Sequence, residues 1–222
     1  MNWRAIFVLV ALGAMAVFGW RWYAQAYRPG AIVEPGEVQY VLAIGDSLTA
    51  GVGNDNVSRY WPEILAEKLG ASGAVRLAHQ GDTASQAFGR WELQIRSKRW
   101  KDNDPDWQPD LVVICLGGND VRRGTGRSAL EHDLNRWAEA LKPLDVPVLL
   151  VAVPGGVLGP LDVYSGLWEE VARRHGMYEM DSQALRRVFT NRDMTVDGIH
   201  MNQAGQDFFA EQVHRRVTGR GR

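Results

Sequence analysis

The segment YVLAIGDSLTAG, residues 40–51, gives the clearest indication of the fold. An apolar run that begins at Tyr40 ends at Gly45, and an Asp-Ser-Leu sequence follows directly. Short apolar runs bounded by turn residues are typical of buried strands. A strand that stops at Gly45 would present Ser47 at one edge of a sheet. Turn chemistry alone explains such a serine, so its role depends on the rest of the chain.

Composition narrows the class of protein before any motif is considered. The chain has 222 residues, of which 45% are hydrophobic and 23% charged, values typical of a globular protein long enough for one domain with a real core. Its formal net charge of −1 argues against a general nucleic-acid binder, which needs a strong positive field. The single cysteine, Cys115, lies in the apolar run LVVICL, so we expect a buried and inert thiol.

Residues 1–28 differ from the rest and predict a signal peptide or a single membrane anchor. The apolar run 5–20 is longer than the ~7–15 residues of a signal-peptide core and shorter than the ~17–25 of a membrane span. Ala-Gln-Ala at 24–26 favours cleavage, whereas the aromatic residues around Arg21 favour a retained anchor, and both remain open. Either one predicts export, to the periplasm or to the periplasmic side of the inner membrane if the source is bacterial. Residues 29–38 are interpreted as a linker.

From residue 39 onward, short apolar runs alternate with segments of helical periodicity. Strands are expected at 40–45, 74–78, 110–116, 146–153 and 177–180, and helices at 60–69, 83–99, 128–142, 161–175 and 203–217. The third and fourth strands are nearly continuous aliphatic runs, as expected for strands covered on both faces. The alternation predicts a three-layer α/β/α sandwich with a mainly parallel five-stranded sheet over residues 39–218, followed by a basic tail at 219–222.

Three loops are expected at one edge of this sheet, because ligands bind beyond the carboxyl ends of parallel strands. They are 45–48, 80–83 and 117–120, and each begins where an apolar strand ends. A nucleophilic serine in the first loop would need a base, a group that orients the base, and donors for an oxyanion.

His200 is the best candidate for the base. It lies between the last two helical patterns, three residues after Asp197 in the sequence Asp-Gly-Ile-His. On a loop this spacing lets the carboxylate reach Nδ1 while Nε2 faces elsewhere, as a catalytic triad requires, although a turn followed by an Asn202 helix cap also explains it. The other histidines, which have structural explanations of differing strength, are His79, His132, His175 and His214.

Two further residues are candidate oxyanion donors. Asn119 follows a double glycine, and its side-chain amide could donate into a cleft, although an Asn-Asp turn explains it as well. The N–H of Gly81 could point the same way, although a strand-to-helix turn is the simpler interpretation.

The four blocks together carry more information than any one of them. GDSL at 45–48, the Gly81 of QGDT, the Asn119 of LGGND and the His200 of DGIH closely resemble, in order and spacing, the SGNH/GDSL hydrolase family. The resemblance covers about residues 39–217 and extends to bacterial periplasmic thioesterases, lysophospholipases and arylesterases. It implies an SGNH/flavodoxin-like fold and a serine hydrolase of acyl esters or thioesters. We expect a monomer that uses no metal or cofactor.

By that resemblance Ser47 is the nucleophile, His200 the general base and then general acid, and Asp197 the orienting carboxylate. The oxyanion hole would comprise the Ser47 N–H, the Gly81 N–H and the Asn119 amide. Asp46 is expected to brace the turn rather than to act on substrate.

The chain departs from the family pattern at two places. Met201 follows the histidine where family members usually have proline. They often carry an asparagine shortly before the glycine of the second block, where this chain reads LAHQG and contains His79. Neither position carries the chemistry, but each bears on rigidity or pocket shape. Segment 154–167, with Val157, Leu158 and Leu161, is expected to form part of an apolar acyl pocket.

Other classes of protein fit the sequence less well. The serine lacks the G-x-S-x-G context of α/β-hydrolases, and no G-x-G-x-x-G, P-loop or zinc-spacing pattern is present. A carbohydrate O-acetylesterase and an inactive, membrane-tethered binding protein of the same fold remain as alternatives. The second would be expected to lose one of the four blocks, and all four are intact.

Overall fold

The computed structural model describes residues 30–51, 57–97, 107–154, 158 and 163–220. The chain divides into two compact units, Met1–Gly30 and Ala31–Arg222. The hydrophobic helix expected at 5–20 lies outside the described residues. Within the described ranges, no helix combines the length and the apolar character that crossing a membrane requires.

A five-stranded, entirely parallel sheet forms the centre of the second unit, as predicted. Its strands are β1 (Tyr40–Gly45), β2 (Gly73–Ala78), β3 (Leu111–Cys115), β4 (Val148–Val151) and β5 (Tyr178–Met180). Their order is β2-β1-β3-β4-β5. The chain therefore adds β2 on one side of β1 and then adds β3, β4 and β5 in turn on the other side, which places a switch point between β1 and β3. A switch point of this kind leaves a crevice beyond the carboxyl ends of the strands, and loops that follow β1, β2 and β3 meet there.

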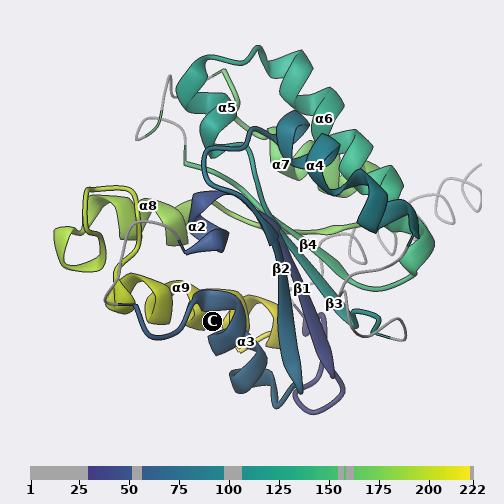
Figure 1. Cartoon of the computed structure of the whole chain (residues 1–222), viewed down its shortest axis with the longest axis vertical. Helices are drawn as coiled ribbons and strands as arrows, with labels where there is room; N and C mark the ends of the chain where they lie inside the picture. Colours follow the sequence, from purple (N-terminus) through teal and green to yellow (C-terminus); the bar gives the residue numbers. More distant parts are fainter. Residues whose placement is uncertain (1–29, 52–56, 98–106, 155–157, 159–162, 221–222) are drawn as a thin grey trace, which may run out of the picture. The chain divides into compact units, whose positions relative to one another are not determined.

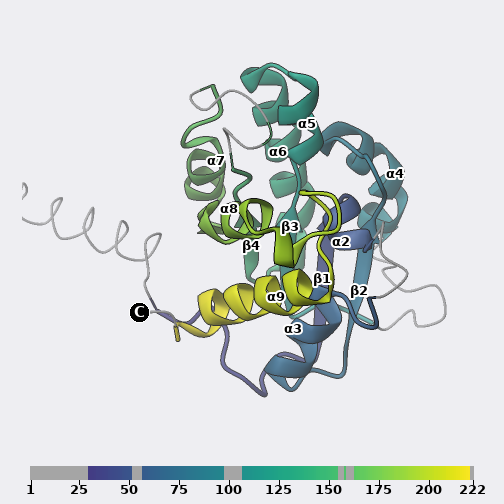
Figure 2. The ribbon, with the colours of Figure 1, turned by 90° about the vertical axis from the view of Figure 1, so that its left-hand side faces the viewer.

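Helices cover both faces of the sheet (Figure 1). The layer on one face contains α4 (Ala84–Ser97), α6 (Arg127–Leu141) and α7 (Leu167–His175). The other layer contains α3 (Trp61–Leu69), α8 (Gln183–Thr190) and α9 (Gln203–Thr218), with α8 beside α9 (Figure 2). Short helices α2 (Ser47–Ala50) and α5 (Gly118–Arg123) follow β1 and β3, and 3₁₀ turns span Lys142–Leu144 and Arg192–Met194.

The side chains of β1 show why this strand is an uninterrupted apolar run. Leu42 and Ile44 belong to the core under α4, α6 and α7, whereas Val41 and Ala43 belong to the core under α3, α8 and α9. All four are 0% exposed. Successive side chains of a strand point to opposite faces. Because both faces are covered here, β1 shows no alternation of apolar and polar residues.

Several element boundaries differ from the sequence-based expectation. The helix expected at 161–175 begins at Leu167, because residues 163–166 form a turn. Helix α8 was not predicted, although the apolar spacing of Ala184, Leu185, Val188 and Phe189 is a helical signal. Within residues 29–38, interpreted as a linker, the N–H groups of Ile32 and Val33 donate to the Val217 carbonyl.

Candidate active site

The turn after β1 places Ser47 at the first position of α2. Asp46 is the N-cap residue, and its Oδ1 accepts a hydrogen bond of 3.0 Å from the Leu48 N–H, which confirms that it braces the turn. Gly45 is required here, because a Cβ at this position would lie 2.1 Å from Thr49 Oγ1 and 3.1 Å from the Cys115 carbonyl oxygen. The serine is 8% exposed.

The loop before α9 brings His200 to this serine. His200 Nε2 lies 3.1 Å from Ser47 Oγ, and His200 Nδ1 lies 2.6 Å from Asp197 Oδ2. The other carboxylate oxygen, Oδ1, accepts from the backbone N–H groups of Ile199 (3.0 Å) and His200 (2.8 Å). An aspartate at Nδ1 favours the tautomer with the proton on Nδ1, so that Nε2 can accept the serine proton.

Backbone pairing, rather than a proline, holds the histidine loop in place. Thr195 and Met201 form an antiparallel bridge, and the Val196 N–H donates to the His200 carbonyl at 2.9 Å. The Met201 side chain is 3% exposed and belongs to the core under α3, α8 and α9. Asn202 caps α9 as expected, because its Oδ1 accepts from the Gly205 N–H. The histidine loop is therefore anchored although Met201 stands where family members usually have proline.

The electrostatics of Asp197 suit an orienting carboxylate. Partial burial opposes its ionisation, but the hydrogen bonds from His200 and Ile199 outweigh that effect and lower the pKa of Asp197 to about 2. The carboxylate is therefore charged throughout the neutral range and can stabilise an imidazolium.

Gly81 lines the same pocket as Ser47 and His200. It has φ +77°, in the left-handed region that favours glycine, and its carbonyl accepts a 2.7 Å hydrogen bond from Arg123 on α5. Among the hydrogen bonds between described residues, none uses the N–H of Ser47 or of Gly81. Both donors are consequently available to a ligand in the pocket.

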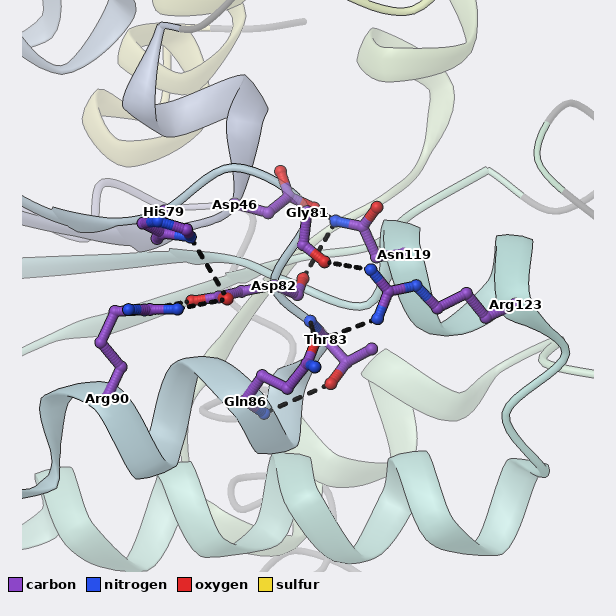
Figure 3. A network of polar contacts seen from close by, with 9 residues as sticks. All are labelled: Asp46, His79, Gly81, Asp82, Thr83, Gln86, Arg90, Asn119 and Arg123. Carbon is purple, nitrogen blue, oxygen red and sulfur yellow. Dashed lines mark hydrogen bonds and ion pairs between the residues drawn. The ribbon is translucent and has the colours of Figure 1, made fainter.

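Asn119 lies beside the serine turn, but its amide is already engaged. Nδ2 donates to Asp46 Oδ2 at 3.0 Å and to the Asp82 carbonyl at 2.9 Å (Figure 3). An amide nitrogen has two hydrogens, so both have protein acceptors in this state. The structure thus brings the expected donor to the site without leaving it a free hydrogen.

A network of polar side chains holds the QGDT turn, which carries Gly81 and Asp82 (Figure 3). Asp82 is 4% exposed, and its carboxylate accepts hydrogen bonds of 2.9 and 3.1 Å from Nε and an Nη of Arg90. His79 Nδ1 lies 3.5 Å from the same carboxylate, outside the residues that line the pocket. This network fixes the backbone that presents Gly81 and the Asp82 carbonyl.

Buried carboxyl groups surround the serine turn. Burial raises the pKa of Asp46 to about 6, against the opposing effects of the Leu48 N–H and the charge of His200. Burial also raises the pKa of Asp120, whose Oδ2 accepts from the Ala84 N–H at 2.8 Å. Cys115 is 1% exposed, which confirms the expected burial. No group of His, Cys, Asp or Glu side chains in the described ranges is arranged to hold a metal ion.

The pocket itself is small, about 100 Å³, and one part of its wall is apolar. That part comprises Leu48, Leu158, Phe189 and Ile199. Leu158 was expected in the pocket, and this is confirmed, whereas Val157 and Leu161 lie outside the described residues. Phe189 was missed because α8 was not predicted, and the polar lining residues Gln80 and Arg122 carry no sequence signal of their own.

A serine, a histidine and an aspartate linked by hydrogen bonds at the carboxyl edge of a parallel sheet define the class of serine hydrolases. The sequence model of the GDSL-like Lipase/Acylhydrolase family matches residues 43–208. The chain therefore belongs to the GDSL-like lipase/acylhydrolase family.

Individual relatives agree with this assignment. "Esterase TesA" of Pseudomonas aeruginosa is 28% identical over 196 residues, which cover 82% of this chain and 89% of that protein. "Thioesterase 1/protease 1/lysophospholipase L1" of Escherichia coli is 27% identical over 187 residues, covering 80% of this chain and 82% of that protein. A crystal structure of TesA superposes with a TM-score of 0.67 at 27% identity, over 81% of this chain and 98% of that chain.

Proposed function

We propose that the protein hydrolyses acyl esters or thioesters through an acyl-enzyme formed on Ser47. The observation that carries this proposal is the continuous path from Ser47 Oγ to His200 Nε2 at 3.1 Å and from His200 Nδ1 to Asp197 Oδ2 at 2.6 Å. Ser47 attacks the acyl carbon while His200 takes its proton, and Asp197 stabilises the resulting imidazolium. The imidazolium then protonates the leaving alcohol or thiol, and a water activated by the same histidine releases the acid.

The tetrahedral intermediate carries a negative oxygen that needs donors. The N–H groups of Ser47 and Gly81 are the first two, because both residues line the pocket and neither N–H is used by another described residue. The amide of Asn119 is the third, and it must share or exchange one of its present acceptors to serve.

The apolar part of the wall favours an aliphatic acyl group as the substrate's acid portion. Leu158, Phe189 and Ile199 line the pocket together with Ser47, so a hydrocarbon placed there would lie next to the reacting carbon. The names of the relatives, an esterase and a thioesterase/lysophospholipase, are consistent with such substrates.

A screen of p-nitrophenyl esters from acetyl to palmitoyl tests the activity. We expect hydrolysis of at least one ester, and a loss of about 10⁶ in kcat on Ser47→Ala, the scale typical of a triad nucleophile. The matched control is Ser72→Ala, at an exposed bend just before β2, which should retain the activity of the parent. Hydrolysis by a folded Ser47→Ala protein at the parental rate, or none by the parent on any ester, would refute the proposal.

We further propose that the enzyme is exported, with residues 5–20 as a signal segment or a membrane anchor. The support is the apolar run flanked by Arg4 and Arg21 in the sequence. Mass spectrometry of the protein from membrane and soluble fractions of its native host tests this. An intact N-terminus in the cytosolic fraction would contradict both versions.

A further inference from the structure

Of the three proposed oxyanion donors, Asn119 alone has no free hydrogen among the described residues. Both hydrogens of its amide are donated to protein acceptors. Its Nδ2 lies 3.0 Å from Asp46 Oδ2 and 2.9 Å from the Asp82 carbonyl oxygen. The side chain is 7% exposed, so water has little access to it. Whatever fixes this amide in the free enzyme therefore determines which of its atoms a substrate meets.

The two acceptors are held differently. The Asp82 carbonyl belongs to a backbone segment fixed by the ion pair between the Asp82 side chain and Arg90. The Asp46 acceptor is a side-chain carboxylate, 3% exposed, whose other oxygen accepts from the Leu48 N–H. The Asp82 carbonyl is an acceptor at every pH, and the Asp46 carboxylate is acceptor-only when it is ionised, so both then face the nitrogen rather than the oxygen of the Asn119 amide.

We propose that Asp46 is a positioning residue for the oxyanion hole. Its carboxylate selects the orientation of the Asn119 amide that turns the NH₂ group toward the Ser47 turn, and it yields part of that hydrogen bond to the oxyanion during acyl transfer. This inference rests on the proposed function. It gives the aspartate of the GDSL block a role in the chemistry beyond capping α2, exerted through Asn119 rather than on substrate.

Charge changes during the reaction fit this exchange. The groups that face Asp46 electrostatically are His200, Asp120 and Cys115. When His200 takes the serine proton, its positive charge favours the ionised carboxylate, so the amide stays oriented while the oxyanion forms. Since burial raises the pKa of Asp46 to about 6, a proton on this carboxylate below that pH would put an O–H where the amide requires an acceptor.

A double-mutant cycle separates positioning from general structure. In Asp46→Asn the new side chain can still accept from the Leu48 N–H, but its NH₂ opposes the NH₂ of Asn119 and favours a rotated amide. We expect kcat to fall roughly 10–100-fold with KM within about threefold, part of the 10²–10³ typical of a lost oxyanion donor. The matched control is Asp133→Asn, a buried aspartate on α6, for which kcat should stay within about twofold of the parent.

The decisive comparison is the double variant Asp46→Asn/Asn119→Ala. We expect its kcat to equal that of Asn119→Ala within about threefold, because Asp46 has nothing left to position. Losses that multiply, or an Asp46→Asn enzyme with parental kcat, would overturn the inference while leaving the proposed function intact. A parental kcat for Asn119→Ala would instead refute Asn119 as a donor, and the inference with it.

A pH titration of the parent protein follows the Asn119 amide directly. The side-chain ¹⁵N–¹H signals of Asn119, identified by their absence in Asn119→Ala, should shift with a midpoint near pH 6 as Asp46 ionises. In His200→Ala the midpoint should rise, because the charge of His200 lowers the pKa of Asp46. Signals that stay constant from pH 5 to 7.5 would overturn the inference.

Discussion

The two sides of the Ser47 turn are prepared to different degrees. On the histidine side, Ser47, His200 and Asp197 already form a continuous hydrogen-bonded path, with distances of 3.1 and 2.6 Å. On the opposite side, Asn119 uses both amide hydrogens on Asp46 and Asp82. Proton transfer can begin without rearrangement, whereas the contribution of Asn119 to oxyanion stabilisation requires an exchange of hydrogen bonds.

This difference follows from what each side binds before substrate arrives. A serine hydroxyl supplies its own hydrogen to His200, so the path is complete within the protein. An oxyanion exists only during the reaction, and buried donors without acceptors are costly, about 1–3 kcal/mol each. Protein acceptors such as Asp46 therefore satisfy the Asn119 amide until the oxyanion forms.

A substitution on the histidine side of the Ser47 turn should lower kcat more than one on the Asn119 side. We expect Asp197→Asn to lower kcat by up to about 10⁴, because the tautomer and orientation of His200 would no longer be fixed. The substitution also removes the carboxylate whose pKa is lowered to about 2, so the imidazolium loses its stabilising charge. Steady-state kinetics on a p-nitrophenyl ester check this, with Asp207→Asn on the exposed face of α9 as the control. A loss below about tenfold would mean that Asp197 does not orient the base.

A substitution on the Asn119 side should lower kcat less. Asn119→Ala is expected to lower kcat by about 10²–10³ with little change in KM, because the donor acts mainly in the transition state. Asn135→Ala is the matched control, since Asn135 bonds to Glu131 and His175 on the helical layer away from the site. A raised KM with unchanged kcat would assign Asn119 to substrate binding instead.

The smallest expected effect is on the free energy of unfolding, and it tests the ionisation of Asp46. Its folded-state pKa, raised to about 6, exceeds the unfolded value of about 3.9, so the folded state binds more protons between these two values. The contribution of Asp46 to the free energy of unfolding therefore falls as pH rises from about 4 to about 6, by up to about 3 kcal/mol.

Urea unfolding of the parent and of Asp46→Asn at pH 4 and pH 7 measures this difference. The variant should gain stability relative to the parent between the two pH values, because asparagine does not titrate. An equal change in both proteins would show that Asp46 is not held above its ordinary pKa.

The sequence predicted the parts of the site that depend on local pattern. The apolar run of β1 ending at Gly45 placed Ser47 correctly, and the short spacing from Asp197 to His200 produced the expected carboxylate–imidazole contact. Parallel strands with both faces covered follow from continuous aliphatic runs such as the one in β3.

The sequence could not predict features that depend on contacts between distant segments. Asn119 meets Asp46 across 73 positions and the Asp82 carbonyl across 37, and no local pattern shows that both amide hydrogens are used. The bridge that compensates for Met201 is also tertiary. Helix α8 was missed because a helix of 8 residues gives only two turns of periodicity.

The exchange of hydrogen bonds at Asn119 is tested most directly by a pair of high-resolution crystal structures, of the free enzyme and of a phosphonate adduct on Ser47. We predict that His200 keeps its bond to Asp197 in both, while Asn119 Nδ2 donates to the phosphonyl oxygen only in the adduct and lengthens its bond to Asp46 Oδ2. An adduct in which Asn119 keeps both present acceptors unchanged and lies beyond hydrogen-bonding distance of the phosphonyl oxygen would contradict it.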